Sequence, residues 1–348
     1  MLNKVRNEMK NQQLDGLWIT DPNSLNYLFE IDIETGERFI GVYITQTSVK
    51  LVLNKLFTTN KLDIIYYYDH QDIHSIIARL TSGTKIGLDK TMQAQYALNL
   101  INNHPEKEFV NGSDCVDKLR AIKTKEQINK MIKASKLNDT IMEIIRDELE
   151  VGMTEIQIRD RIEELFYEYG SEPCFTTIIA FGDHGTDPHA IPTNRILKEN
   201  ESIIIDMGCK VDDYCSDMTR TYFMNSNPIQ EIYDLVLEAN TKAIEAIKPG
   251  VTFSDIDKVA RDIITKGGYG DYFTHRLGHG IGQEVHEPYD VSASNHQKVL
   301  PGMCFSIEPG IYKPKVDGVR IEDLVYINEQ GTAEVLNHVP KNKPVLKK

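Results

Sequence analysis

The segment SIIIDMGCKVDDYCSDMTRTY, residues 202–222, constrains the fold most, because it carries two acids inside sequence that is typical of β-strands. Three isoleucines lead into Asp206, a polar turn follows, and Asp217 then precedes β-branched and aromatic residues. A symmetric hairpin about Val211 and Asp212, with KVDD as its loop, would set Asp206 opposite Asp217. Opposed Cβ atoms lie about 5 Å apart, and like charges there destabilise a sheet. The hairpin therefore needs something that neutralises its two acids.

Residues 304–327 repeat the pattern in a second predicted hairpin, which turns about Lys315 and places Glu308 opposite Glu322. A bulge at Pro309-Gly310 would shift this register. One such pair alone could be explained by a turn or cap acid, or by two carboxyl groups that share a proton. Two pairs are harder to explain in this way, because each unpaired buried carboxylate costs several kcal/mol. Divalent cations are the simplest compensation, since four carboxylates can hold two ions about 3.5–4 Å apart around a shared activated water.

The segment THRLGHGIGQEVHEP, residues 274–288, adds imidazoles that Mn²⁺, Co²⁺ or Zn²⁺ would accept as ligands. A lone histidine is more often a surface or core residue than a ligand. Three within twelve residues, among glycines that let the backbone approach closely, indicate a site. These histidines are His275, His279 and His286, and the DPHA segment adds His189. The glycine spacing differs from G-x-G-x-x-G and follows no clear strand, which argues against a dinucleotide or phosphate loop.

The length of 348 residues predicts two domains, because single cores rarely exceed about 300 residues. The net charge of −13 argues against nucleic-acid and anionic-membrane partners, which need a basic face. We see no signal-peptide pattern and no apolar run of membrane-spanning length, and therefore expect a cytoplasmic protein. The five cysteines are unevenly spaced and should be reduced, with Cys209 and Cys215 as packing thiols.

Strand-like and helical stretches alternate in the first hundred residues, which predicts a small α/β domain over residues 1–120. Residues 121–348 should form a second domain of α+β class, with helices set against strands that are mostly linked as hairpins. Capping boxes predict helices over 124–149 and 154–169. Two further helices should begin at Asn227-Pro228 and at Ser254.

Five segments in order, IIIDMG, SDMTRT, GHGIGQEVHE, SIEPG and VRIED, resemble the pita-bread metallopeptidases. This family includes methionine aminopeptidase, aminopeptidase P, Xaa-Pro dipeptidase and creatinase. The resemblance covers about residues 120–340 and implies a pita-bread catalytic domain over 121–348. DGLWITDPNSLNYLFEI resembles the start of the creatinase-type N-terminal domain, which methionine aminopeptidases usually lack. The ending LNHVPK resembles bacterial Xaa-Pro dipeptidases.

The resemblance implies two divalent metal ions and assigns five ligand positions, all of which hold the family residue. Asp206 would chelate one ion, Asp217 and Glu322 would bridge both, and His279 and Glu308 would bind the other. The expected ion is Mn²⁺, with Co²⁺ or Zn²⁺ as alternatives.

The same resemblance implies that Glu308 takes a proton from a metal-bridging water. His189 and His286 would steady the scissile carbonyl or the tetrahedral intermediate. Arg320 lies two residues before Glu322 on the same strand face, and it would orient the ligand carboxylates by hydrogen bonds without binding the metal itself. A surface salt bridge is the alternative for Arg320.

One stretch departs from the family pattern. In relatives, the stretch that ends at the histidine matching His189 commonly reads SGxNxxxPH. This chain has AFGDHGTDPH there, with Phe181 and His184 in place of serine and asparagine. We expect His184 to be solvent-exposed or to lie at the rim of the pocket, rather than to be a further metal ligand.

The sequence thus predicts an Xaa-Pro dipeptidase that cleaves dipeptides ending in proline. The alternative is aminopeptidase P, which removes the first residue from longer peptides with proline second and needs the same metals. A catalytically inactive pita-bread binding protein is a third reading, and creatinase, which uses the fold without metal, is a fourth; five intact ligand positions disfavour both. The resemblance also implies a homodimer.

Overall fold

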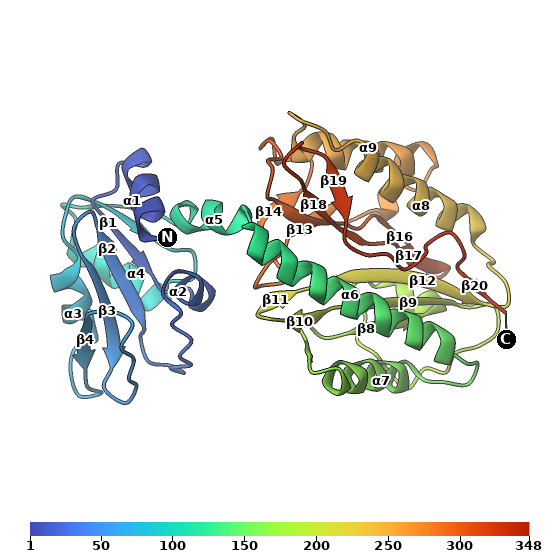
Figure 1. Cartoon of the computed structure of the whole chain (residues 1–348), viewed down its shortest axis with the longest axis horizontal. Coiled ribbons are helices and arrows are strands. Elements are labelled where there is room, and N and C mark those ends of the chain that lie inside the picture. The colour runs from blue at the N-terminus through green and yellow to red at the C-terminus, as the bar shows by residue number, and fades with distance from the viewer. Residues whose placement is uncertain (348) are drawn as a thin grey trace. The chain divides into compact units, whose positions relative to one another are not determined.

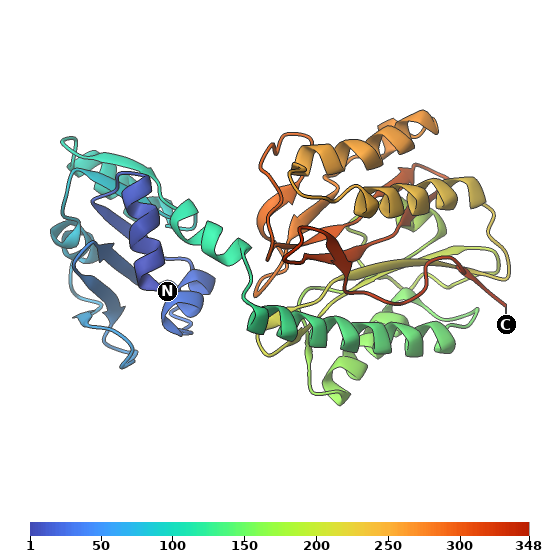
Figure 2. The same ribbon diagram turned by 45° about the horizontal axis from the view of Figure 1, so that its top comes forward.

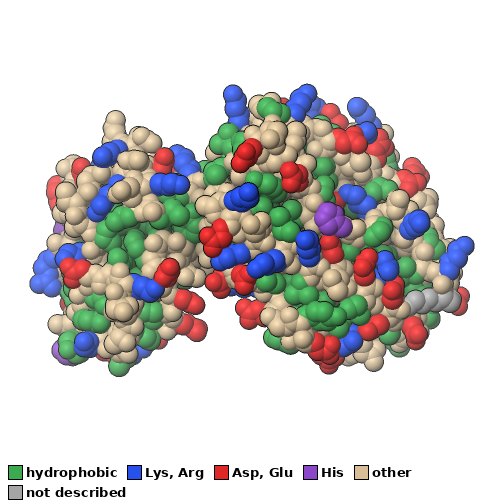
Figure 3. All heavy atoms as spheres, viewed as in Figure 1, with side chains coloured by type: hydrophobic (Ala, Val, Ile, Leu, Met, Phe, Trp, Pro, Cys, Tyr) green, Lys and Arg blue, Asp and Glu red, His purple; other side chains and the backbone are tan. Residues whose placement is uncertain are grey.

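The structure is a computed structural model that describes residues 1–347. The chain divides into two compact units, Met1–Arg120 and Ala121–Lys348. None of the helices among the described residues has both the length and the apolar character that a bilayer crossing requires. The space-filling view shows acidic and basic side chains interspersed over the visible face of each unit (Figure 3).

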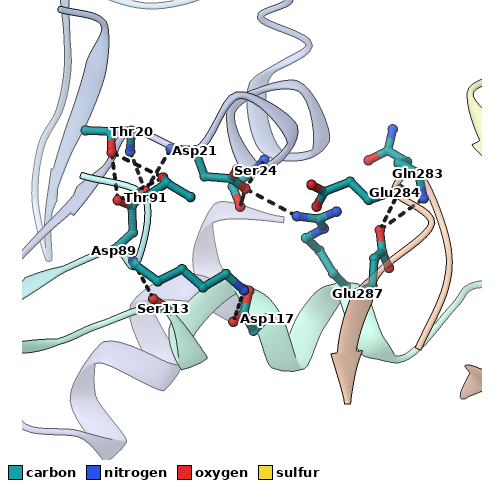
Figure 4. A network of polar contacts seen from close by, with 12 residues as sticks. Thr20, Asp21, Ser24, Asp89, Thr91, Ser113, Asp117, Gln283, Glu284 and Glu287 are labelled. Carbon is teal, nitrogen blue, oxygen red and sulfur yellow. Dashed lines mark hydrogen bonds and ion pairs between the residues drawn. The ribbon is translucent and has the colours of Figure 1, made fainter. Parts of the chain in front are cut away.

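The first unit is an α/β domain built on a six-stranded mixed sheet of strand order β4-β3-β2-β1-β5-β6. Its strands are β1 (Gly16–Ile19), β2 (Gly41–Thr45), β3 (Val49–Asn54), β4 (Ile64–Tyr67), β5 (Lys85–Leu88) and β6 (Glu108–Asn111). Its helices are α1 (Leu2–Asn11), α2 (Pro22–Phe29), α3 (Ile73–Leu80), α4 (Ala94–Asn103) and α5 (Asp114–Ala121). Just past β5, Asp89 accepts hydrogen bonds from Thr20 Oγ1 (2.7 Å) and Asp21 N (2.8 Å), which ties together the ends of β1 and β5 (Figure 4).

Four α-helices belong to the second unit: α6 (Lys125–Glu148), α7 (Glu155–Glu168), α8 (Gln230–Glu245) and α9 (Phe253–Lys266). Both predicted capping boxes, at Thr124 and Thr154, are present. The other two predicted helix starts are wrong. Asn227 accepts a hydrogen bond from Ile229 N in a turn before α8 begins, and α9 is capped by Thr252 with Asp255 rather than by Ser254.

The second unit has strands in several small sheets. They are β7 (Glu172–Pro173), β8 (Ile178–Phe181), β9 (Ser202–Met207), β10 (Cys209–Val211), β11 (Tyr214–Cys215), β12 (Met218–Met224), β13 (Gly278–Gly280), β14 (Glu287–Val291), β15 (Cys304–Ile307), β16 (Gly310–Lys313), β17 (Asp317–Arg320), β18 (Asp323–Ile327), β19 (Ala333–Val335) and β20 (Val345–Leu346). The sheet orders are β11-β10-β7, β20-β12-β9-β8, β14-β13-β15-β18-β19 and β16-β17. In the part of the chain that the structure describes, only β12 and β20 pair in parallel within this unit.

The helices of the second unit cover its strands from two sides, which is the predicted α+β arrangement (Figures 1 and 2). On one side, α8 and α9 pack on β15, β17 and β18 through a core that includes Val236, Ile256 and Phe305. On the other side, α6 and α7 pack on β8, β9 and β12 through a core that includes Ile145 and Ile162.

The two predicted acid-bearing hairpins are present, but only one has the predicted register. The β16–β17 and β15–β18 ladders turn about Lys315 as expected, and Glu308 and Glu322 lie between the two ladders. In the first hairpin, the two turn residues are Asp212 (φ 51°) and Asp213 (φ 68°), one position later than predicted. Asp206 therefore pairs with Thr219, and the prediction that Asp206 directly faces Asp217 is wrong. Because the register differs by two residues, Asp206 and Asp217 still lie on one face of the sheet.

Candidate metal centre

The two hairpins and the glycine-rich segment line a single cavity of about 1010 Å³ within the second unit. Its wall contains all eight residues that the sequence nominated for the site: His189, Asp206, Asp217, His279, His286, Glu308, Arg320 and Glu322. They come from segments that span more than a hundred residues of chain. The structure therefore brings together the complete predicted set in one concave place, which is where ligand sites occur.

Three of the acids lie at breaks between consecutive strands, where the chain borders the cavity. Asp217 occupies the gap between β11 and β12, and Glu308 and Glu322 occupy the gaps that follow β15 and β17. The glycines of the third segment allow the sheet to close around them. A Cβ atom on Gly278 would stand 1.9 Å from Ser306 O, so only glycine permits β13 to pack beside β15 at this point.

His279 lies at the middle of the acid cluster. Its Nε2 is 3.3 Å from Glu308 Oε1 and 3.7 Å from Asp217 Oδ2. The ligand atoms of Asp217, His279 and Glu322 all lie within 4.8 Å of one another. Because His279 Nδ1 contacts Gly280 O at 3.1 Å, that nitrogen carries the proton and Nε2 presents a lone pair to the cluster. Burial lowers the pKa of His279 to about 3, which keeps the ring neutral as a metal ligand must be.

The acids of the cluster are incompletely satisfied by the protein. Asp206 Oδ1, Asp217 Oδ1 and Glu322 Oε1 are buried and have no hydrogen-bond partner among the described residues. Burial, and then the charge of Glu322, raise the pKa of Asp217 well above its usual range. Burial, and then the charge of Glu308, do the same to the pKa of Glu322. Buried carboxylate oxygens that repel one another and lack donors fit divalent cations.

The donor set also fits particular ions. Four carboxylates and one neutral imidazole suit Mn²⁺, Co²⁺ or Zn²⁺, whereas Mg²⁺ and Ca²⁺ favour oxygen ligands alone. The cysteines of this region stand apart from the cluster: within residues 1–347, the one group of metal-ligating atoms that lie close together contains Asp217, His279 and Glu322 and no thiol.

Arg320 is a buried arginine that holds two of the acids in place. It is 3% exposed, and its Nη2 donates to Asp206 Oδ2 at 2.7 Å. Its Nε donates to Thr219 Oγ1 at 3.1 Å, and that hydroxyl donates to Glu322 Oε2 at 2.9 Å. Arg320 thus holds Asp206 directly and Glu322 through Thr219, and the alternative of a surface salt bridge does not apply.

Sequence reasoning missed three polar residues that hold the site. Thr219 and Ser306 each lie two positions from an acid, and Ser306 Oγ donates to Glu308 Oε1 at 3.1 Å and accepts from His279 N at 3.0 Å. The two-residue period of a strand would have placed both hydroxyls on the faces of the acids. Tyr312, the third, accepts a hydrogen bond from Arg320 Nη1 at 2.9 Å. No sequence signal distinguishes this tyrosine from an ordinary core residue.

His189 and His286 face the cavity from two loops, and both are exposed. The ring of His286 meets that of His279 edge-on, with centroids 4.3 Å apart. Its loop is held by buried Glu287, whose Oε1 accepts from Gln283 N at 3.0 Å (Figure 4). His189 follows Pro188, whose carbonyl accepts from Arg320 Nη1 at 3.2 Å. Both rings can therefore reach a molecule in the cavity, while neither is committed to the acid cluster.

The prediction for His184 is wrong. Its ring is half-buried, and its Nδ1 lies 2.7 Å from Oε1 of Glu155, a fully buried acid that also accepts from Phe181 N and Thr193 N. Neither His184 nor Phe181 lines the cavity. The unusual pair is thus part of the packing between α7 and the loop that carries His189, because the buried carboxylate of Glu155 requires donors from that loop.

Known proteins match this chain along nearly its whole length. The family model of metallopeptidase family M24 matches residues 129–329, and that of the creatinase/prolidase N-terminal domain matches residues 1–122. An uncharacterized peptidase of Staphylococcus aureus (strain USA300) is 38% identical over 350 residues, which cover 98% of this chain and 99% of the relative. A dipeptidase from Mycobacterium ulcerans is similar in structure, with a TM-score of 0.93, 29% identity and coverage of 100% and 97%. An Xaa-Pro dipeptidase from Bacillus anthracis gives a TM-score of 0.87, 28% identity and coverage of 99% of both chains.

Proposed function

The chain belongs to metallopeptidase family M24 and begins with a creatinase/prolidase N-terminal domain, and on this premise we propose that it is a dinuclear dipeptidase specific for Xaa-Pro dipeptides. The predicted pita-bread fold and metallopeptidase class are confirmed by these matches and by the similar dipeptidase structures. The observation that carries the finer proposal is the cluster of acids in which the buried oxygens Asp206 Oδ1, Asp217 Oδ1 and Glu322 Oε1 have no donor among residues 1–347.

We assign the ion-binding roles as the resemblance implies. Asp206 would hold one ion, Asp217 and Glu322 would lie between two, and His279 with Glu308 would hold the second. Bound divalent ions supply a water of lowered pKa and polarise a peptide carbonyl. We propose Mn²⁺ as the resident ion, with Co²⁺ or Zn²⁺ able to replace it, because the donor set combines carboxylates with an imidazole.

The chain's own residues would supply proton transfer and orientation. Burial raises the pKa of Glu308 to about 7 in the absence of a metal ion, and we propose Glu308 as the group that accepts a proton from the water. His189 and His286 would donate hydrogen bonds to the carbonyl oxygen as negative charge develops on it. Ser306 keeps Glu308 in place through its hydroxyl, at 3.1 Å.

Proline-containing dipeptides are the proposed substrates, because similar solved structures include an Xaa-Pro dipeptidase over the full chain length. Aminopeptidase P activity is the second candidate, since it would use the same residues. A binding protein without catalysis is disfavoured, because recognition alone gains nothing from buried acids that repel one another.

The test compares Leu-Pro and Ala-Pro with the tripeptides Leu-Pro-Gly and Ala-Pro-Gly, using the purified full-length protein in saturating Mn²⁺. We expect the dipeptides to have the higher kcat/KM. Preference for the tripeptides would favour aminopeptidase P, and cleavage of none of the four peptides would contradict both proposals. Asp217→Ala, prepared in parallel, shows whether any cleavage comes from a contaminant.

Two predictions from the sequence concern the protein as a whole. Light scattering coupled to size-exclusion chromatography tests the proposed homodimer. The proposed cytoplasmic location is tested by fractionation of the cells that produce the protein.

A further inference from the structure

Arg276 presents a charged group to the cavity that has no ion-pair partner within the described part of the chain. The side chain is exposed and lines the cavity together with Glu308 and His286. Within residues 1–347 its guanidinium makes no hydrogen bond and no ion pair. The other arginine of the cavity wall, Arg320, is fully committed to Asp206, Tyr312 and Thr219. Arg276 therefore remains available for an anion that enters the cavity.

The backbone that carries Arg276 is held firmly beside the reacting centre. His275 Nδ1 donates to Arg276 O at 2.6 Å, while the Nε2 of the same ring contacts Tyr312 OH at 2.9 Å. The next residue, Leu277, accepts from Glu308 N at 2.8 Å through its carbonyl. One residue earlier, Arg261 Nη2 donates to His275 O at 3.0 Å. The backbone at the base of this side chain is therefore fixed next to Glu308.

The charge of Arg276 affects the pKa of His286, one of the two histidines proposed to orient the substrate. Burial, and next the charge of Arg276, lower the pKa of His286. This effect agrees with a guanidinium that faces the same space as the imidazole. An anion that reaches Arg276 would thus also lie close to His286.

Lys210 is the other cation of the cavity wall that is not bound to the acid cluster. It differs from Arg276 in its surroundings, because it stands opposite Glu172 in the backbone register of β10 and β7, and Glu172 also lines the cavity. It differs also in chemistry, since a guanidinium can form bidentate hydrogen bonds with both oxygens of a carboxylate, whereas an ammonium group acts as a point charge.

We propose that Arg276 is a specificity-determining residue that binds the C-terminal carboxylate of a dipeptide substrate. The inference rests on the proposed dipeptidase function and names the residue that would select dipeptides. In a dipeptide, the carboxylate lies one residue beyond the scissile bond, whereas a longer peptide has a neutral amide at that place. A bidentate ion pair with Arg276 would therefore favour the shorter substrate.

The test uses the Mn²⁺-loaded full-length protein with two ligands, Leu-Pro and its C-terminal amide, which differ only in the negative charge. For Arg276→Gln we expect the KM for Leu-Pro to rise about 10- to 100-fold, as loss of a charge-assisted pair predicts. The kinetic constants for the amide should change by less than about twofold, because the amide never made this contact. Arg276→Lys should recover part of the loss for Leu-Pro.

Two variants serve as controls. Arg159→Gln removes an arginine of α7 that pairs with Asp160 and lies outside the cavity wall, and it should behave as wild type. Lys210→Gln examines the competing cation. The inference is overturned if Arg276→Gln affects the acid and the amide equally, or affects neither. It is also overturned if the loss selective for the carboxylate appears in Lys210→Gln instead.

Calorimetric titration of the same two ligands separates this inference from the proposed function. If the wild type binds Leu-Pro more tightly than the amide without hydrolysing it, and Arg276→Gln abolishes the difference, the role of Arg276 stands and the dipeptidase proposal fails. If the wild type hydrolyses Leu-Pro and Arg276→Gln leaves the preference for the acid intact, the function stands and the role of Arg276 fails. Equal binding of acid and amide to a wild type that hydrolyses neither contradicts both.

Discussion

Arg320 Nη2 donates a 2.7 Å hydrogen bond to Asp206 Oδ2 and so joins the two acid-bearing hairpins, whose residues here are 114 positions apart in the chain. Asp206 is the last residue but one of β9 in one hairpin, and Arg320 is the last residue of β17 in the other. The pair is buried, and Tyr312 and Thr219 hold the guanidinium from the sides. The geometry of the acid cluster therefore depends on this one side chain.

We predict that Arg320→Lys weakens metal retention and lowers kcat/KM for Leu-Pro by about 10- to 100-fold, since groups that orient metal ligands typically have effects of this size. A lysine keeps the charge but lacks the planar fork that reaches Asp206, Thr219 and Tyr312 together. Metal content after dialysis and steady-state kinetics measure the two effects. Arg161→Lys is the control, because Arg161 donates to both carboxylate oxygens of Glu148, at 3.0 and 3.2 Å, outside the cavity wall. It should lower stability yet leave the metal content per folded molecule unchanged; wild-type metal content and kinetics in Arg320→Lys would contradict the prediction.

Removal of metal should abolish hydrolysis of Leu-Pro, and addition of Mn²⁺ or Co²⁺ should restore it. We also expect the metal to raise the melting temperature, because an ion that binds only the folded state stabilises it by about 2.7 kcal/mol at a hundredfold excess over Kd. Thermal unfolding of the dialysed and reloaded protein measures this effect. Full activity after metal removal verified by elemental analysis would rule out the metal-dependent mechanism.

Asp217→Asn should have opposite effects on activity and on the stability of the metal-free protein. Turnover should disappear because a ligand between the two proposed ions is lost. The metal-free variant should melt at a higher temperature than the metal-free wild type, since one charge of a repelling buried cluster is gone. Differential scanning calorimetry with and without Mn²⁺ tests both parts. The control Asp212→Asn lies at the exposed turn of the same hairpin and should match wild type; a lower melting temperature for metal-free Asp217→Asn would argue against stored repulsion.

Asp317 predicts a pH dependence that does not involve the metal ligands. Burial raises the pKa of Asp317 from 3.8 to about 6, while Ser202 and Gly318 N donate to its carboxylate. A raised pKa means that the fold favours the protonated acid, so this group lowers the free energy of unfolding as pH rises from about 4 through 6.

Asp317→Asn mimics the protonated acid and should remove this loss. Relative to wild type, the variant should be about equally stable near pH 4 and more stable at pH 8, by on the order of 3 kcal/mol. Urea unfolding of the metal-free proteins at both pH values measures the difference. The exposed acid Asp160 provides a control, Asp160→Asn, which should follow the wild-type curve. A pH-independent difference between Asp317→Asn and wild type would contradict the prediction.

The two hairpins show how far sequence reasoning reached. The register of the second hairpin was predicted by symmetric folding about Lys315, and the structure agrees along both ladders. For the first hairpin, KVDD offered two adjacent places for a two-residue turn. The aspartates Asp212 and Asp213 adopt the positive φ that such a turn needs, whereas β-branched Val211 strongly disfavours it. Stricter use of turn chemistry would have corrected the register.

His184 shows where sequence reasoning had no basis for a decision. Its place in the stretch that departs from SGxNxxxPH led us to expect an exposed side chain or one at the rim of the pocket. Instead, the ring of His184 contacts the buried carboxylate of Glu155 in α7, 29 residues earlier in the chain. Such a contact depends on how a helix and a loop meet, which local sequence patterns do not encode.

The sequence by itself indicated the candidate residues for the chemistry, because acids and clustered histidines inside apolar strand sequence are costly unless a function requires them. It also indicated which side chains of a strand share one face of the sheet, since side chains alternate with a period of two. The tertiary structure alone decided which neighbours satisfy those residues: Arg320 on Asp206, Thr219 on Glu322 and Ser306 on Glu308. These contacts join segments that meet only when the layers of the domain pack, and register, turn geometry and burial act together to set their distances.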